Sequence, residues 1–187
     1  SVTIKGSNNI INGNGDNMEE LNYVIGSTPA YCCVAFKRID GLNVSGIKFE
    51  NGLVECAIVL DCRNITIENC EFNGSLYDNG LSIYNTLYNT TYHEDDNSTW
   101  TNAIVRNCKA NRCMDFGMTA FKTVNVTFEN CISTECGNDS SNQVNKGGGY
   151  SAENYDIERN SMTNFLNCKA ISCKGRGQKW NKRNGAS

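Results

Sequence analysis

The segment Ile65-Thr66-Ile67-Glu68-Asn69-Cys70-Glu71-Phe72 contains the pattern that decides the fold of this chain. In this segment Ile65 and Ile67, which are separated by one residue, precede the pair Asn69-Cys70. An equivalent arrangement occurs three more times in the chain. The four Asn-Cys pairs occupy residues 69–70, 107–108, 130–131 and 167–168. A fifth copy, residues 42–49, has Gly46 in place of the Asn. The chain is therefore predicted to consist of repeats.

The repeats have a short and interrupted period. Successive Asn positions, counted from Gly46, are 23, 38, 23 and 37 residues apart, so two bare repeats alternate with two that carry insertions. A period near 23 residues is typical of a solenoid. Short segments with alternating apolar residues indicate strands rather than helices. Because such strands cannot bury their inner face alone, we expect successive coils to stack.

One coil is predicted to contain three strands. In the second coil these are residues 58–60, 65–67 and 70–72, with a sharp bend at Asn69. Asn and Gly suit this bend because both tolerate the left-handed backbone conformation. Stacking of the coils would place the Asn side chains in a hydrogen-bonded ladder.

This pattern resembles the right-handed parallel β-helix of the pectin-lyase-like superfamily, which includes pectate lyases, polygalacturonases and phage tailspikes. The resemblance rests on the repeats and on the opening segments Val2-Thr3-Ile4-Lys5-Gly6 and Ile10-Ile11-Asn12-Gly13-Asn14-Gly15. It implies an all-β fold, a right-handed single-stranded parallel β-helix of about five to six coils over residues 1–173. Residues 174–187 would form a basic C-terminal tail. The resemblance is specific for the fold and not for an activity, because this fold hosts many chemistries.

Length and charge limit the possible partners. The 187 residues are enough for one domain with a core, and no apolar run is long enough to cross a membrane. The formal net charge is −3, but the last fourteen residues carry five Lys or Arg and no acid. This tail is either a solvated terminus or a surface for an acidic polymer, RNA or another subunit; the acidic body makes nucleic acid an unlikely partner. We expect a processed chain, an excised fragment, or a subunit whose open end meets a partner.

The eleven cysteines are predicted to be mostly free thiols. Cys70, Cys108, Cys131 and Cys168 fall at the same inward position of successive coils. Stacked side chains stay about 4.8 Å apart, whereas a disulfide prefers a Cβ separation of about 3.8 Å. A zinc site is not indicated, because no Cys-x-x-Cys pair is present and the chain has one His.

The insertions predict a groove. Residues 85–101 and 154–162 lie between the first and second strands of their coils, and residues 137–148 precede a first strand, so these loops flank one sheet. On that sheet we expect Ile58 and Leu60 to face inward, and two columns to face outward. The first column is Lys37, Asp61, Tyr84, Phe121 and Glu153, and the second is Val59, Ser82, Thr119 and Ser151.

These columns supply the candidate site. Tyr84, Phe121, Ser82 and Thr119 are the candidate substrate-binding residues, since sugar rings stack on aromatic rings and sugar hydroxyls accept and donate hydrogen bonds. Asp61, Glu153, His93 and Lys37 are the candidate catalytic residues, and Glu94, Asp95 and Asp96 are candidate calcium ligands. A plain solvated surface with a Lys37–Asp61 ion pair explains the same pattern. Asp61 and Glu153 should be about 14 Å apart, too far for the carboxylate pair of an inverting glycosidase.

The motifs of polygalacturonases, namely Asn-Thr-Asp, Gly-Asp-Asp, Gly-His-Gly and Arg-Ile-Lys, are absent. Resemblance to pectate lyases implies a basic residue that abstracts a proton and a calcium ion that holds the acid. We therefore expect a β-helix that engages an extended polysaccharide, as a lyase or glycoside hydrolase, outside the cell or on a virion surface. The alternative is a non-catalytic structural or adhesive solenoid that forms homo-oligomers, either trimers or end-to-end filaments.

Overall fold

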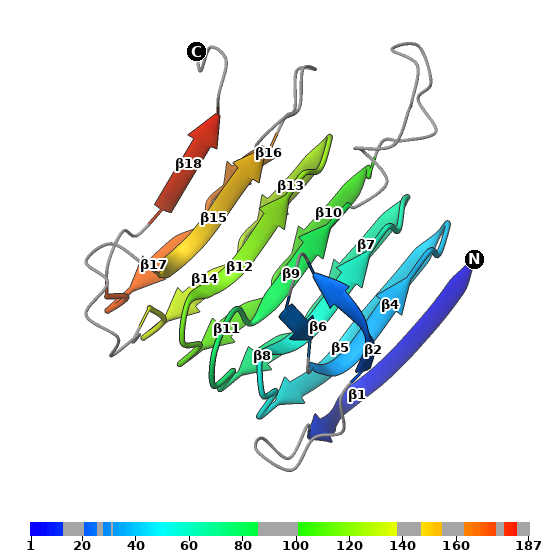
Figure 1. Ribbon diagram of the computed structural model, residues 1–187, viewed down its shortest axis with the longest axis horizontal. Coiled ribbons are helices and arrows are strands. Elements are labelled where there is room, and N and C mark those ends of the chain that lie inside the picture. Colours follow the sequence, from blue (N-terminus) through cyan, green and yellow to red (C-terminus); the bar gives the residue numbers. More distant parts are fainter. Residues whose placement is uncertain are drawn as a thin grey trace.

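The computed structural model describes residues 1–12, 21–25, 28–30, 32–85, 101–137, 147–154, 163–174 and 178–182. Within these ranges the chain is all-β and its two large sheets are built from parallel strands (Figure 1). None of the described residues belongs to a helix of the length and apolarity that a membrane span requires.

The larger sheet has ten strands and carries two strands from each complete repeat. Its members are β1 (Val2–Asn12), β5 (Leu42–Glu50), β7 (Ile65–Glu68), β8 (Glu71–Asn73), β10 (Ala103–Arg106), β11 (Lys109–Asn111), β13 (Val126–Glu129), β14 (Ile132–Thr134), β16 (Thr163–Leu166) and β17 (Lys169–Ile171). The long strand β5 pairs with β7 along its first half and with β8 along its second half. The sheet therefore consists of two parallel ladders that meet in β5.

The smaller sheet has six strands and forms the third ladder. Its members in spatial order are β18 (Gln178–Lys182), β15 (Gly148–Asn154), β12 (Phe116–Phe121), β9 (Leu81–Tyr84), β6 (Glu55–Leu60) and β4 (Cys32–Lys37). A separate antiparallel pair is formed by β2 (Leu21–Ile25) and β3 (Thr28–Ala30). Strand β18 lies within the segment that we considered as a solvated tail, and it pairs with β15.

The chain visits the three ladders in a fixed order, and each visit lies beside the previous one (Figure 1). Ile67 pairs with Val105, Val105 with Phe128, and Phe128 with Phe165. These residues occupy the same place in successive repeats, so the prediction that equivalent residues stack is confirmed. Neighbouring layers are about 4.8 Å apart, the ordinary distance between hydrogen-bonded strands.

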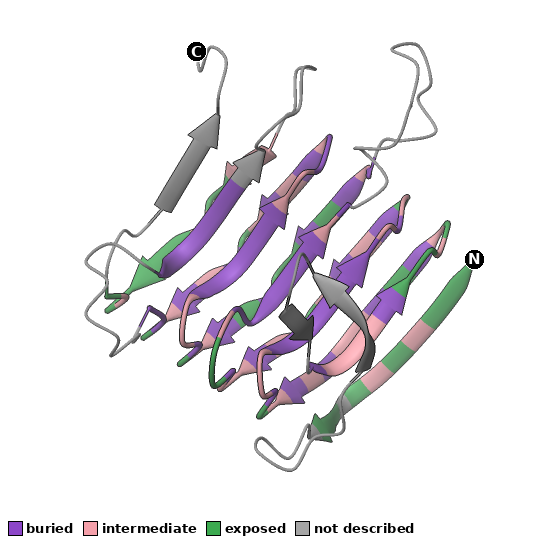
Figure 2. Cartoon of the chain, viewed as in Figure 1, coloured by how far each residue is buried: buried purple, intermediate pink, exposed green. Residues whose placement is uncertain are grey.

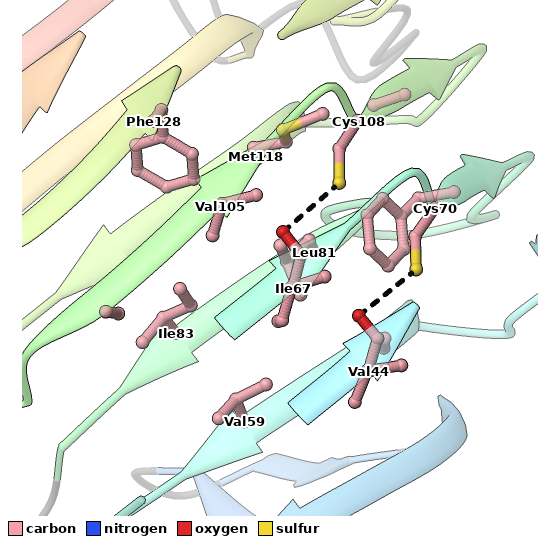
Figure 3. Close-up of a cluster of buried hydrophobic side chains, with 14 of the residues drawn as sticks. Val44, Val59, Ile67, Cys70, Leu81, Ile83, Val105, Cys108, Met118 and Phe128 are labelled. Carbon is pink, nitrogen blue, oxygen red and sulfur yellow. Dashed lines mark hydrogen bonds between the residues drawn. The ribbon is translucent and has the colours of Figure 1, made fainter. Parts of the chain in front are cut away.

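The inward side chains form columns in the interior, and buried residues predominate on the central strands, whereas β1 and β17 are largely exposed (Figure 2). Phe49 stacks on Phe72 with ring centroids 5.5 Å apart, and Phe128 stacks on Phe165 at 5.1 Å. Valine, isoleucine, leucine and methionine side chains fill the space between the ladders (Figure 3). Each fully buried side chain of this size contributes roughly 1.5–3 kcal/mol to folding.

The bends between strands depend on residues in the left-handed backbone region. Gly46, Asn69, Asn107, Asn130 and Asn167 all have φ between +51° and +67°, as predicted for the Asn bend. Three further columns of bends have the same conformation. Their non-glycine members are Arg38, Asn51, Asp61, Asn64, Asn102, Arg112, Lys122, Asn125, Glu135 and Ser172. Each such residue costs about 1–2 kcal/mol when it is not Gly, and less for Asn.

Most cysteines directly follow one of these left-handed residues. The pairs are Asp61-Cys62, Asn69-Cys70, Asn107-Cys108, Arg112-Cys113, Asn130-Cys131, Glu135-Cys136, Asn167-Cys168 and Ser172-Cys173. The Cys131 thiol lies 3.3 Å from the carbonyl oxygen of Glu129, two residues earlier, and 3.5 Å from that of Val105 in the preceding layer. Figure 3 shows the second type of contact for Cys70 and Cys108. All eleven cysteines are free thiols in the structure.

Asparagine side chains form ladders along the outside of the bends. The amide of Asn167 donates to Asn130 at 2.7 Å, in the column where we predicted a ladder. A second ladder, which the repeat pattern did not reveal, runs from Asn125 to Asn102 at 2.8 Å and from Asn102 to Asn64 at 3.5 Å. These bonds link successive layers through side chains as well as through the backbone.

Replacing Asn107 tests the cost of the left-handed bends. Asn107 is exposed and has φ of +53°, so a change at this position removes little packing. Asn107→Ala should lower the free energy of unfolding by about 1 kcal/mol, whereas Asn107→Gly should leave it unchanged or raise it slightly. Urea denaturation of the two variants measures this difference. Equal stability of the Ala and Gly variants would contradict the argument.

Candidate functional site on the six-stranded sheet

The outward face of the six-stranded sheet has a different register from the one we expected. Leu60 pairs with Tyr84, and Ile58 pairs with Ser82. Because Tyr84 and Ser82 point outward, Ile58 and Leu60 do so as well, and Ala57 and Val59 join the inward core. The prediction that Ile58 and Leu60 face inward is therefore wrong by one residue. Asp61 lies at the bend that follows β6 and not within the column.

The corrected outward columns are continuous across the sheet. The first contains Lys37, Leu60, Tyr84 and Phe121, and the second contains Ala35, Ile58, Ser82, Thr119 and Ser151. The second column is largely covered: Ser82 is 4% exposed, Thr119 is 6% exposed and Ser151 is fully buried. The accessible part of this face therefore lies at the carboxyl ends of the strands.

An aromatic pair marks that accessible edge. The rings of Tyr84 and Phe121 stack with centroids 4.8 Å apart and an interplanar angle of 28°. Both side chains are partly exposed, since stacking covers only one face of each ring. Partial burial and the nearby Asp61 carboxylate raise the pKa of the Tyr84 hydroxyl, so this group stays protonated and can donate a hydrogen bond.

Charged groups of both signs surround the aromatic pair. The Lys122 ammonium lies 5.8 Å from the centroid of the Phe121 ring, within the range of a cation–π interaction. Asp61 and Lys122 occupy left-handed bends at the ends of β6 and β12, and Arg38 occupies the same position after β4. Lys37 is exposed at the end of β4. The edge therefore offers aromatic surface, an acid and several cations within one short stretch of the stack.

A buried polar cluster lies at the opposite ends of the same strands, and sequence reasoning missed it. Glu55, the first residue of β6, is 3% exposed. Its Oε1 accepts a hydrogen bond from the Ser82 hydroxyl, and Asn79 donates both to Glu55 and to Ser82 Oγ. Asn79 is itself held by the backbone N–H of Phe116, which donates to Asn79 Oδ1 at 3.0 Å. Among the described residues, Glu55 Oε2 has no hydrogen-bond partner.

Burial controls the protonation of this cluster. Loss of hydration raises the pKa of Glu55 to about 7, although hydrogen bonds from Ser82 and Asn79 act in the opposite direction. Cys32, the register partner of Glu55, has a pKa raised by its own burial and by the Glu55 carboxylate. The signal in the sequence was a single acid at the start of the apolar run Glu55-Cys56-Ala57-Ile58-Val59-Leu60, where an ionised side chain is costly.

Neither Glu153 nor Glu55 lies close enough to Asp61 to form a catalytic carboxylate pair with it. Three strand spacings separate Leu60 from Glu153, so Asp61 and Glu153 are about 14 Å apart. Glu55 and Asp61 are six residues apart along one strand, about 20 Å. Both separations exceed the roughly 6.5–9.5 Å of an inverting glycosidase. The side chain of Glu153 is outside the described part of the structure, although its backbone belongs to β15.

The inserted loop with the remaining candidates lies outside the described residues. It contains His93, Glu94, Asp95 and Asp96, and it connects β9 to β10. Within the part of the chain that the structure describes, no group of three or more His, Cys, Asp or Glu side chains is placed to hold a metal ion. The predicted calcium ligands therefore stay a prediction.

Comparison with known proteins gives no family for this chain: no family model, no curated protein and no solved structure matches it.

Replacing Glu55 tests the buried carboxyl group. Because the pKa of Glu55 is higher in the folded protein than its ordinary value of 4.5, the group favours folding at low pH. This stabilisation is fully present below about pH 4.5 and is lost as the pH rises to about 7. The side chain of the Glu55→Gln variant cannot ionise. This variant should therefore not show the loss of unfolding free energy with rising pH, which amounts to about 3 kcal/mol in the wild type.

The measurement is the free energy of unfolding at pH 5 and pH 8 for the wild type and Glu55→Gln. A control, Glu129→Gln, alters a partly exposed acid on β13 and should keep the pH dependence of the wild type. Parallel pH profiles for the wild type and Glu55→Gln would show that Glu55 does not titrate in this range.

Proposed function

We propose that the chain is a right-handed parallel β-helix of the pectin-lyase-like type and that it binds an extended polysaccharide. The fixed order of the three parallel ladders supports the solenoid. A right-handed path is supported by a general rule, since connections between parallel strands of one sheet are right-handed in about 98% of cases. A repeating surface suits a repeating polymer, because both present the same groups at regular distances.

The stacked pair Tyr84 and Phe121 is the observation that supports glycan binding best. Aromatic rings offer apolar surface to the C–H groups of a pyranose ring, and the Tyr84 hydroxyl can bond a sugar hydroxyl. Asp61 can accept hydrogen bonds from vicinal hydroxyls, and Lys122 and Lys37 can pair with acidic substituents. We place the ligand at this edge because Ser82 and Thr119 are covered.

If the protein also cleaves its ligand, Lys37 is the described residue best placed to act as a base. It is exposed and lies one strand spacing from Leu60, the residue before Asp61. In a lyase reaction with a uronate polymer, the unprotonated amine of Lys37 would accept the proton α to the carboxylate. A carbon–carbon double bond would form as the glycosidic C–O bond at the β carbon breaks, and the leaving oxygen would take a proton from water. Ultraviolet absorbance of the unsaturated product, with calcium present, would report this reaction, and reducing-end release would report hydrolysis.

Removal of the aromatic pair tests the binding proposal. Tyr84→Ala and Phe121→Ala should each weaken binding of the best ligand in a panel of neutral and uronate polysaccharides by about tenfold, since a buried aromatic contact contributes on the order of 1 kcal/mol. Affinity electrophoresis or calorimetry measures the change. Ile104→Ala removes an apolar side chain on β10 that is 45% exposed and should leave binding unchanged. Unaltered binding in both aromatic variants would reject this site.

The second candidate function is assembly of a structural solenoid through β1. Within the described residues β1 pairs only with β5, and Val2, Ile10 and Ile11 are exposed along it. Unpaired strand edges with apolar side chains favour pairing with another chain. Light scattering should then show oligomers that grow with concentration, and Ile10→Lys should abolish them. A monomer at all concentrations would reject this function.

A further inference from the structure

We propose that a second surface of the protein binds an anionic polysaccharide chain lying along the stack. This surface, which we name the basic face, comprises the outward side chains of the second half of β5 and of β8, β11, β14 and β17. It belongs to the ten-stranded sheet and is separate from the Tyr84–Phe121 edge. The proposal therefore stands or falls independently of the glycan site described above.

Lysines recur on alternate strands of the basic face. The register places Lys48, Glu71, Lys109, Ile132 and Lys169 in one outward column. Two strand spacings separate successive lysines, a distance of about 10 Å. A pyranose unit in an extended chain is about as long as one layer of the stack is high. A polymer with acidic groups on one side of alternate sugars would therefore meet one lysine per acidic group.

Positive charge is concentrated on this half of the sheet. Together with the left-handed bend residue that directly follows each of its strands, the basic face contains the cations Lys48, Lys109, Arg112 and Lys169 and the acids Glu50, Glu71 and Glu135. The outward residues of the other half, on β7, β10, β13 and β16, include one cation, Arg106, and two acids, Glu68 and Glu129. The basic face is thus positive on a chain whose formal net charge is −3.

Glu71 partly neutralises the lysine column. Its carboxylate lies 3.3 Å from the Lys48 ammonium and 3.6 Å from the Lys109 ammonium. The Lys109 side chain is 56% exposed, so its ammonium can turn to a ligand at little cost. An acidic polymer would compete with Glu71 for Lys48 and Lys109. Removal of the Glu71 charge should therefore strengthen binding of the polymer, whereas removal of the lysines should weaken it.

A row of amides and hydroxyls beside the lysines favours a sugar over a nucleic acid. Asn73, Asn111 and Thr134 lie in the next outward column, between Glu50 and Ile171. Asn111 donates to Asn73 Oδ1 at 2.7 Å, and Asn73 donates to Glu50 Oε1 at 3.3 Å. These partly exposed groups can bond sugar hydroxyls. The described outward residues of the basic face include no aromatic ring on which a base could stack, although single-stranded nucleic acids are usually held by such rings.

The test uses two polymers with the same extended backbone, carboxymethyl-cellulose and neutral hydroxyethyl-cellulose. At an ionic strength of about 10 mM, the double variant Lys109→Ala/Lys169→Ala should bind carboxymethyl-cellulose about tenfold more weakly than the wild type. Glu71→Gln should bind it about threefold more tightly, since two lysines are released. The matched control is Arg106→Ala, which removes an exposed cation paired with Glu68 from the same layer and should change binding less than about twofold.

Three results would overturn the proposal. The first is binding within twofold of the wild type for the lysine double variant, and the second is weaker binding by Glu71→Gln. The third is tighter binding of single-stranded DNA than of carboxymethyl-cellulose with the same dependence on Lys109, which would assign the surface to nucleic acid. Tyr84→Ala in the same assay separates the two sites, because it leaves the basic face intact.

Discussion

Backbone hydrogen bonds between successive layers are the interaction on which the rest of this structure depends. Each strand pairs in parallel with its equivalents before and after it in the chain, at a spacing of about 4.8 Å. Residues that are 23 or more positions apart therefore become neighbours, and one choice of side chain is repeated as a column. The stacked phenylalanines, the asparagine ladders and the lysine column all follow from this spacing.

The left-handed bends lower the free energy of unfolding of the stack, and the thiols beside them recover part of that stability. Left-handed residues turn the chain after most of the described strands, and most of them are not glycine. A thiol directly after the bend donates weakly to the carbonyl two residues earlier, as Cys131 does to Glu129, and fills the corner of the core as a small apolar group. A serine would bring a stronger donor but a larger cost of burial, and an alanine would leave a gap. This explains why cysteine recurs at positions where the preceding residue is Asn, Asp, Arg, Glu or Ser.

The sequence predicts the layers well and the outward face poorly, for identifiable reasons. The Asn-Cys pairs located the bends because Asn is chosen there for its backbone conformation. The alternation in β6 could not be determined, since the run from Glu55 to Leu60 is buried on both sides and carries no polar residue after its first position. Its register is fixed instead by Leu81 and Ile83 on β9, whose polar neighbours reveal the outward side. The same burial concealed Glu55, because the environment of a carboxyl group depends on residues from other layers.

Rigid stacking also separates the parts of the sequence that determine the fold from those that determine binding. An inward residue contacts the layer above it and the layer below it. A change there therefore lowers the free energy of unfolding by several kcal/mol and constrains the other residues of its column. An outward residue away from such contacts costs roughly 0.5 kcal/mol or less to replace. Surface chemistry can therefore differ from one ladder to the next at little cost. The two halves of the ten-stranded sheet share one backbone arrangement, yet one half carries a lysine column in which Lys48 and Lys109 pair with Glu71, and the other carries Arg106 paired with Glu68. Stability explains the common backbone but not this segregation of charge, since exposed ion pairs contribute little to folding. The proposed binding of an anionic polymer would account for the uneven distribution of lysine.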